Sequence, residues 1–263
     1  MTRRPFPFGI QPEVSDPGSD ERGFDSMNRL LLHGTRYHHR RAVFVSHELG
    51  ETPDWRADRL SIRIGLALRE DLSVGPGDVV ALFMPLSISW ALVERAVWGL
   101  GAATLPVSSE SGFGRPVKAV FASSAEGLSD LGVPVVALDS DWAALLDRGG
   151  VLDTPERASS FRTGARNTPP DAVCTIESGV ELRHREWVRR IESFLERFPP
   201  ERGARHVLDF SQPHFAARAL LYAGWADGFT TVVLGGDDLD GGSTCRRFAN
   251  LAELEGLEGM SHG

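Results

Sequence analysis

The residues between positions 175 and 187, TIESGVELRHREW, lie where an α/β protein often binds an anion. They follow a short apolar run and lead into an amphipathic helix, and many proteins hold phosphate between a strand end and a helix N-terminus. Such loops are rich in Gly, Ser and Thr and have a Lys or Arg within reach. This stretch has one glycine and two glutamates, Glu177 and Glu181, whose carboxylates repel phosphate. Phosphate binding is therefore not expected here.

Composition narrows the class of protein. The chain has 263 residues with 28 basic and 36 acidic side chains, a net charge of −8, and Lys118 is its only lysine. This balance lacks the basic surface that nucleic acids and anionic membranes need, so neither is an expected partner. Cys174 and Cys245 lie far apart, and His38 and His39 have no partner at metal-ligand spacing. We expect no metal site and a reducing, cytoplasmic location.

Residues 27–150 are predicted to form a first α/β subdomain, after a flexible lead-in at residues 1–26. The apolar run at 79–84 is typical of a strand that is buried on both faces. The other predicted strands of this block are 41–47, 102–107, 117–122 and 133–139.

Local signals place two helices in this block. Thr52 followed by Pro53 resembles an N-cap and a first helical residue, so a helix is expected from there, although residues 60–68 also alternate like a strand. Ser87 can cap a second helix, which should end near Gly101.

A polar stretch at 151–170 is interpreted as a linker to a second, incomplete α/β subdomain at 171–250, followed by a tail at 251–263. Both blocks contain a strand, a turn with proline, an Ala-rich helix that ends in glycine, and a second strand. This alternation predicts two topologically related subdomains with doubly wound, mostly parallel sheets. The elements expected in the second block are strands at 172–176, 205–210 and 230–236 and helices at 187–198 and 215–228.

The stretch VGPGDVVALFMPLSISWALVERAVWGLGAATLPVS, with VKAVFASSAEGL and VPVVALD after it, resembles the N-terminal region of the adenylate-forming superfamily. This superfamily contains acyl-CoA synthetases, adenylation domains of peptide synthetases and luciferases. The resemblance covers roughly residues 27–236. It implies the fold of the N-terminal part of these enzymes.

In that superfamily the strand corresponding to 172–176 runs into the phosphate loop T-S-G-T-T-G-x-P-K-G-V, which is followed by Thr-His. Thr175, Ser178 and Gly179 match the opening of this loop, and His184 matches the histidine after it. The intervening TTGxPKG is missing. The chain also ends before the family's adenine, ribose and catalytic-lysine motifs. The resemblance therefore implies a degenerate phosphate loop, with no ATP or magnesium bound and no adenylation by this chain alone.

The first functional hypothesis is a catalytically inactive, acyl-CoA synthetase-like protein that acts as an interaction or regulatory subunit in acyl-chain or secondary metabolism. It would form a homo-oligomer or bind a biosynthetic enzyme or carrier protein. Apolar residues within 206–234 are expected to be exposed and to form the interface, because the rest of the enzyme would normally cover them.

Two alternatives stay open. One is an enzyme or small-molecule binder that uses a remodelled acyl or carboxylate pocket without ATP chemistry, and the other is a half-enzyme completed by a partner chain. The resemblance places His214 and Phe215 at the acyl pocket, although His214 can also be a helix-start histidine satisfied by backbone or solvent. His184, beside several arginines, is expected to be solvated.

Overall fold

The structure, a computed structural model, describes residues 24–38, 40–46, 49–108, 115–197, 205–208, 215–227, 230–233 and 245–247. Helices and strands alternate along these residues. In chain order they are α1 (Met27–His38), β1 (Ala42–Ser46), β2 (Gly50–Pro53), α2 (Asp54–Leu72), β3 (Val79–Phe83), α3 (Ile88–Gly99), β4 (Ala103–Pro106), β5 (Ala119–Ala122), the 3-10 helix η2 (Ser129–Leu131), β6 (Val135–Ala137), α4 (Trp142–Leu152), α5 (Pro155–Arg166), β7 (Val173–Glu177), β8 (Val180–Arg183), α6 (His184–Arg197), β9 (Arg205–Leu208), α7 (Phe215–Asp227), β10 (Thr230–Val233) and β11 (Cys245–Arg247).

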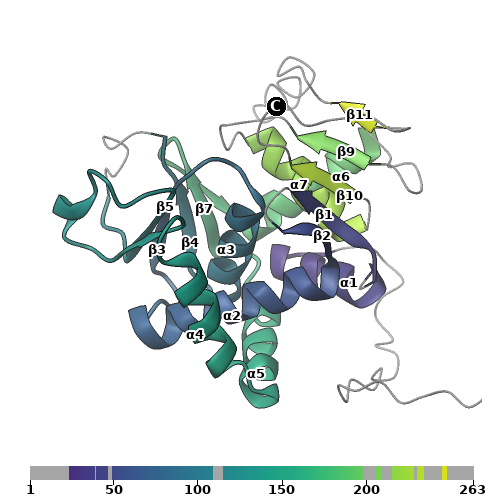
Figure 1. The fold of residues 1–263 in the computed structure, drawn as a ribbon. Coiled ribbons are helices and arrows are strands. Elements are labelled where there is room, and N and C mark those ends of the chain that lie inside the picture. Colours follow the sequence, from purple (N-terminus) through teal and green to yellow (C-terminus); the bar gives the residue numbers. More distant parts are fainter. Residues whose placement is uncertain are drawn as a thin grey trace, which may run out of the picture.

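The strands form two sheets that stand side by side (Figure 1). The six-stranded sheet has the order β6-β5-β3-β4-β7-β8, with all neighbours parallel except the antiparallel edge pair β7–β8. The five-stranded sheet has the order β11-β9-β10-β1-β2, with only the β1–β2 pair antiparallel. The predicted α/β class with mostly parallel sheets is confirmed.

The predicted subdomain boundaries do not follow this strand order. Block 27–150 contributes β1 and β2 to the five-stranded sheet, where β1 pairs with β10, and block 171–250 contributes β7 and β8 to the six-stranded sheet. The expected linker at 151–170 contains the end of α4 and all of α5. A helix begins there because Thr154 caps it through a hydrogen bond from the Arg157 N–H (3.3 Å) and Pro155 follows at the first turn.

The predicted helix starts are correct in one case and displaced in the other. Ser87 caps α3 by accepting a hydrogen bond from the Trp90 N–H (3.1 Å), as expected. Thr52 does not cap α2, because it belongs to β2, and Pro53 is the N-cap. Pairing with β1 therefore extends the strand to the helix start. The α2 sequence is helical to Leu72, which settles the ambiguity between strand and helix.

The main core lies between the helices and one face of the six-stranded sheet and continues to the helices of the five-stranded sheet. Trp90, Trp98 and Trp225 are fully buried in it. The Phe161 ring of α5 packs on two glycines, Gly65 of α2 and Gly99 of α3, where a Cβ would lie 2.3 Å from the ring. Glycine is therefore required at both positions for α5 to approach so closely.

The other face of the six-stranded sheet, which we call the second face, carries a second and smaller core. Among the described residues, its members come only from strands, loops and η2. Several apolar side chains around it are only partly buried, namely Val79, Phe83, Val117, Leu131, Val133, Val135 and Val173. This face thus lacks an α-helical layer in the described part of the chain.

Candidate functional site

A two-residue hairpin turn stands where the resemblance places the degenerate phosphate loop. β7 and β8 pair directly, with Glu177 opposite Val180. Ser178 and Gly179 between them have φ values of 50° and 81°. Positive φ at both central residues is the requirement of a type I′ turn, which matches the twist of the strands on either side. Sequence reasoning missed β8, although Ser-Gly between two pairable segments is a hairpin signal.

This turn is poorly suited to a triphosphate. A phosphate loop surrounds its anion with many backbone N–H groups, whereas a two-residue turn offers few, and its flanking residues pair with each other in the ladder. The carboxylates of Glu177 and Glu181 lie on either side of the turn, and Glu181 forms an ion pair with Arg115 (3.2 Å). Electrostatics at this position therefore oppose a polyanion.

Beneath the hairpin lies a buried arginine that the sequence analysis did not single out. Arg218 of α7 is fully buried, and its Nη2 donates to the Thr175 hydroxyl (3.2 Å). Its Nε donates to Glu94 Oε2 (3.2 Å), and its Nη2 also donates to Glu94 Oε1. Nη1 lies 3.6 Å from Glu177 Oε2. Arg218 thus joins α3, α7 and the end of β7.

Glu94 is the centre of this buried network. Besides the guanidinium, it accepts hydrogen bonds from the Trp90 indole (3.0 Å), the Thr104 hydroxyl (2.7 Å) and the Tyr222 hydroxyl. Burial and the neighbouring carboxylate raise the pKa of Tyr222 well above its usual range. Burial by itself would lower the pKa of Arg218, but the carboxylates of Glu94 and Glu177 outweigh it, and the pKa is raised. Arg218 therefore stays charged.

A sequence signal for this network existed. Glu94 lies within an apolar helix segment, ISWALVERAVWG, and Arg218 within another, FAARALLYAGWAD. A charged residue in the middle of such a helix is rarely buried unless it is paired. The pairing itself could not be read from the sequence, because the two residues are 124 positions apart.

His184 was expected to be solvated, and this prediction is wrong. It is the first residue of α6 and is fully buried, with its ring in edge contact with Trp98 (6.1 Å between centroids). Within the described residues, neither ring nitrogen has a hydrogen-bond partner. Burial lowers the pKa of His184 from 6.5 to about 4. The β8 hairpin is the physical reason, because it turns the start of α6 into the core.

We expect acid to destabilise the protein through His184. In the unfolded chain this histidine gains a proton below pH 6.5, whereas the buried ring resists protonation until about pH 4. Stability is therefore complete above pH 6.5 and falls as the pH drops towards 4, by about 3 kcal/mol in total. Between pH 7 and pH 5, urea unfolding should show wild type losing about 2 kcal/mol more than His184→Phe. Equal losses in the two proteins would contradict this assignment.

The remaining predicted positions are only partly visible. His214 and His39 lie outside the described residues. Phe215 is the first residue of α7, and its side chain is outside the part of the chain that the structure describes. The expectation that apolar residues in 206–234 are exposed is wrong for α7, because the helix packs between α1 and α6. Its buried apolar residues are Ala217, Ala219, Leu220, Leu221, Tyr222, Ala223, Trp225 and Ala226. Among the described residues, no group of three or more His, Cys, Asp or Glu could hold a metal ion.

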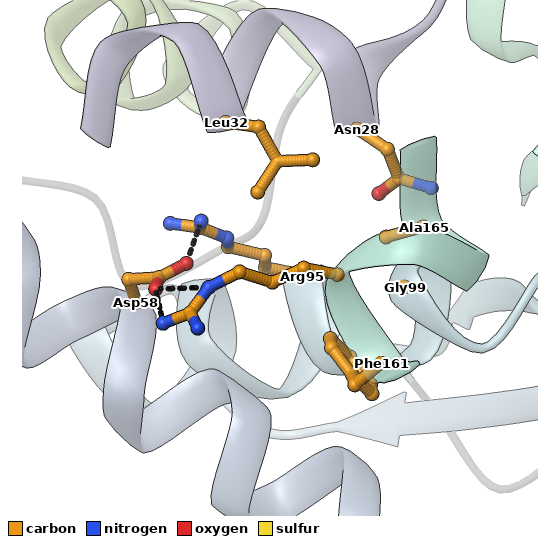
Figure 2. A pocket seen from close by; sticks show the side chains of 8 residues that line it. Asn28, Leu32, Asp58, Arg95, Gly99, Phe161 and Ala165 are labelled. Atoms are coloured by element: carbon orange, nitrogen blue, oxygen red, sulfur yellow. Dashed lines mark hydrogen bonds and ion pairs between the residues drawn. The ribbon is translucent and has the colours of Figure 1, made fainter. Parts of the chain in front are cut away.

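A hollow between α1, α2, α3 and α5 is too small for an organic ligand. Asp58, labelled in Figure 2, lines this hollow, and two guanidinium groups, those of Arg95 and Arg162, bind its carboxylate. Asn28 and Phe161 are among the other residues that line it, and its volume is about 10 Å³. That is room for roughly one water molecule. The charged groups here tie helices together.

The solved structures that this chain resembles are adenylate-forming enzymes. A fatty acyl CoA synthetase of Mycobacterium tuberculosis has a TM-score of 0.57 and 16% identity, over 81% of this chain and 45% of that one. An adenylation–PCP fusion, NpsA-ThdA from Klebsiella oxytoca, has a TM-score of 0.63 and 12% identity, over 80% and 39%. The o-succinylbenzoate CoA synthetase of Bacillus subtilis has a TM-score of 0.60 and 14% identity, over 87% and 46%.

The chain has the fold of the N-terminal region of adenylate-forming enzymes. The match confirms the resemblance to the N-terminal region of these enzymes at the level of fold, and the chain spans less than half the length of these three structures. No protein-family model matches the sequence, and no curated protein matches it. Within the described part of this adenylate-forming fold, every helix is too short or too polar to cross a membrane.

Proposed function

We propose that this protein has the adenylate-forming fold without the adenylation reaction, and that it acts as an interaction or regulatory subunit. The observation that carries this proposal is the type I′ turn at Ser178 and Gly179, in the position of the phosphate loop. Adenylation depends on positioning and neutralising phosphate charge. The nearest buried cation, Arg218, is already paired with Glu94. We therefore propose that the protein binds neither ATP nor magnesium.

Partner binding is the second part of the proposal. α7 is buried, so the interface expected there moves to the second face of the six-stranded sheet. Partly exposed apolar residues gathered on one face are typical of protein interfaces. The occupant we propose is a second copy of this chain, a biosynthetic enzyme or a carrier protein of acyl-chain or secondary metabolism. The free, buried thiol of Cys174 suits a reducing cytoplasm.

The first test is thermal stability of the purified protein with Mg-ATP, AMP, CoA, carboxylic acids and acyl thioesters, with its mass in solution measured alongside. A ligand at 100 times its Kd adds about 2.7 kcal/mol, which is visible as a shift in Tm. We expect no shift with Mg-ATP and no carboxylate-dependent exchange of pyrophosphate into ATP. A catalytically competent adenylate-forming enzyme, run in parallel, is the positive control. A shift with Mg-ATP would contradict the proposal.

A second candidate function is a small-molecule binder that uses a remodelled carboxylate pocket without ATP chemistry. Arg218 favours it, because a buried guanidinium beside the end of a parallel strand is the group that binds carboxylates most specifically. A half-enzyme completed by a partner chain is less favoured, since the partner would also have to replace the internal loop.

A further inference from the structure

Arg218 has one donor group that its buried partners leave unused. Its Nε and Nη2 atoms are bound to Glu94 and Thr175. Within the described part of the chain, Nη1 has no hydrogen-bond partner, and the Glu177 carboxylate at 3.6 Å lies beyond hydrogen-bond distance. A buried N–H of a cation that makes no hydrogen bond costs free energy, so this atom has an unmet need for an acceptor.

Two carboxylates, those of Glu94 and Glu177, surround the single positive charge of Arg218. Glu94 is fully buried and neutralises the guanidinium through two nitrogens. Glu177 therefore brings a second carboxylate to a cation that is already paired. If Glu177 turns away from Arg218, the guanidinium keeps Glu94 as its counter-charge, whereas loss of Glu94 would remove its fully buried partner.

Glu177 also lies on the side from which a ligand would arrive. Its side chain is 24% exposed, while that of Arg218 is fully buried. It is the last residue of β7, and parallel α/β sheets bind ligands at the carboxyl ends of their strands. Thr175 on the same strand accepts from Arg218 Nη2 and holds the guanidinium plane in place.

We propose that Arg218 Nη1 and the end of β7 form a binding site for one small oxyanion, a carboxylate or a monophosphate, and that the Glu177 carboxylate occupies this site as an internal competitor. An incoming oxyanion would displace Glu177 towards solvent and accept the Nη1 hydrogen bond. The Arg218–Glu94 pair would stay as it is. The site deepens the second candidate function by naming its ligand class, and it needs no nucleotide.

The test removes the competitor and keeps the cation. Glu177→Ser should bind inorganic phosphate or acetate at least ten-fold more tightly than wild type, measured as the Tm rise over a concentration series. The ionic strength is kept constant with sodium chloride, because phosphate stabilises proteins in general. The matched control is Glu181→Ser, which removes a carboxylate from the paired strand that forms its ion pair with Arg115 instead.

A response of Glu177→Ser to either anion at concentrations at least ten-fold lower than Glu181→Ser needs supports the site, and the anion that binds more tightly assigns its class. No response to either anion overturns it. An equal response in Glu181→Ser overturns it too, because binding would then reflect general loss of negative charge at the hairpin. Binding of Mg-ATP is measured in a separate experiment. A result that contradicts the oxyanion site can therefore be told apart from a result that contradicts the proposed non-adenylating function.

Discussion

Replacing Arg218 by methionine is expected to lower the free energy of unfolding by about 3–5 kcal/mol, because it leaves the Glu94 carboxylate buried without a counter-charge. Methionine fills similar space, so the loss reports charge rather than volume. Urea unfolding followed by tryptophan fluorescence measures it, since Trp90 and Trp187 lie against the guanidinium.

The double variant Glu94→Gln with Arg218→Met is the control. Glutamine keeps an oxygen for the Tyr222 hydroxyl and the Trp90 indole but carries no charge. Most of the stability lost in Arg218→Met should therefore return in the double variant. If Arg218→Met loses less than about 1 kcal/mol, the pair is not the buried, charged contact that the structure shows.

Phe161→Ala is the second change with a large expected effect, also about 3–5 kcal/mol. The Phe161 ring fills the space above Gly65 and Gly99, and neither glycine has a side chain that could move into the cavity. Phe161→Leu keeps part of the volume and should cost less. Thermal or urea unfolding of the three proteins gives the order wild type, Phe161→Leu, Phe161→Ala.

A double-mutant cycle with Gly65→Ala, inside α2, makes this prediction specific. In wild type the new methyl group would lie 2.3 Å from the ring, so Gly65→Ala should destabilise. In the Phe161→Ala background the clash is gone, and alanine in a helix interior is about 0.8–1.0 kcal/mol better than glycine. The sign of the Gly65→Ala effect should therefore reverse. The same sign in both backgrounds would contradict the packing described here.

Local order was largely predictable from the sequence. Buried strands such as β3 are continuous apolar runs, and Ser87 caps α3 through atoms three residues apart, so both leave a signal within a short window. The pairing of strands that are far apart in the sequence left no such signal. Nothing in the sequence says that β1 pairs with β10 rather than with the strands that follow it, and the two predicted subdomains were therefore drawn across both sheets.

The candidate site shows the same division. Residue order alone led to the prediction that Ser178 and Gly179 stand where the phosphate loop of the resembling enzymes would open. Tertiary packing decides the rest. It makes these two residues close a hairpin, buries His184 as a consequence, and brings Arg218 against Glu94. Charged residues inside apolar helices were the one sequence clue to the buried network.

The hairpin turn has a consequence for engineering. A Cβ added at Gly179 would meet nothing within 4 Å, and the next residue, Val180, is 59% exposed, so the turn faces open space. Once a loop is flexible, each doubling of its length costs only about 0.6 kcal/mol more, although replacing a tight turn costs extra. We therefore expect flexible peptides inserted between Ser178 and Gly179 to be tolerated. A complete glycine-rich loop with a lysine could be inserted at this junction, which makes the protein a scaffold for rebuilding nucleotide chemistry one segment at a time.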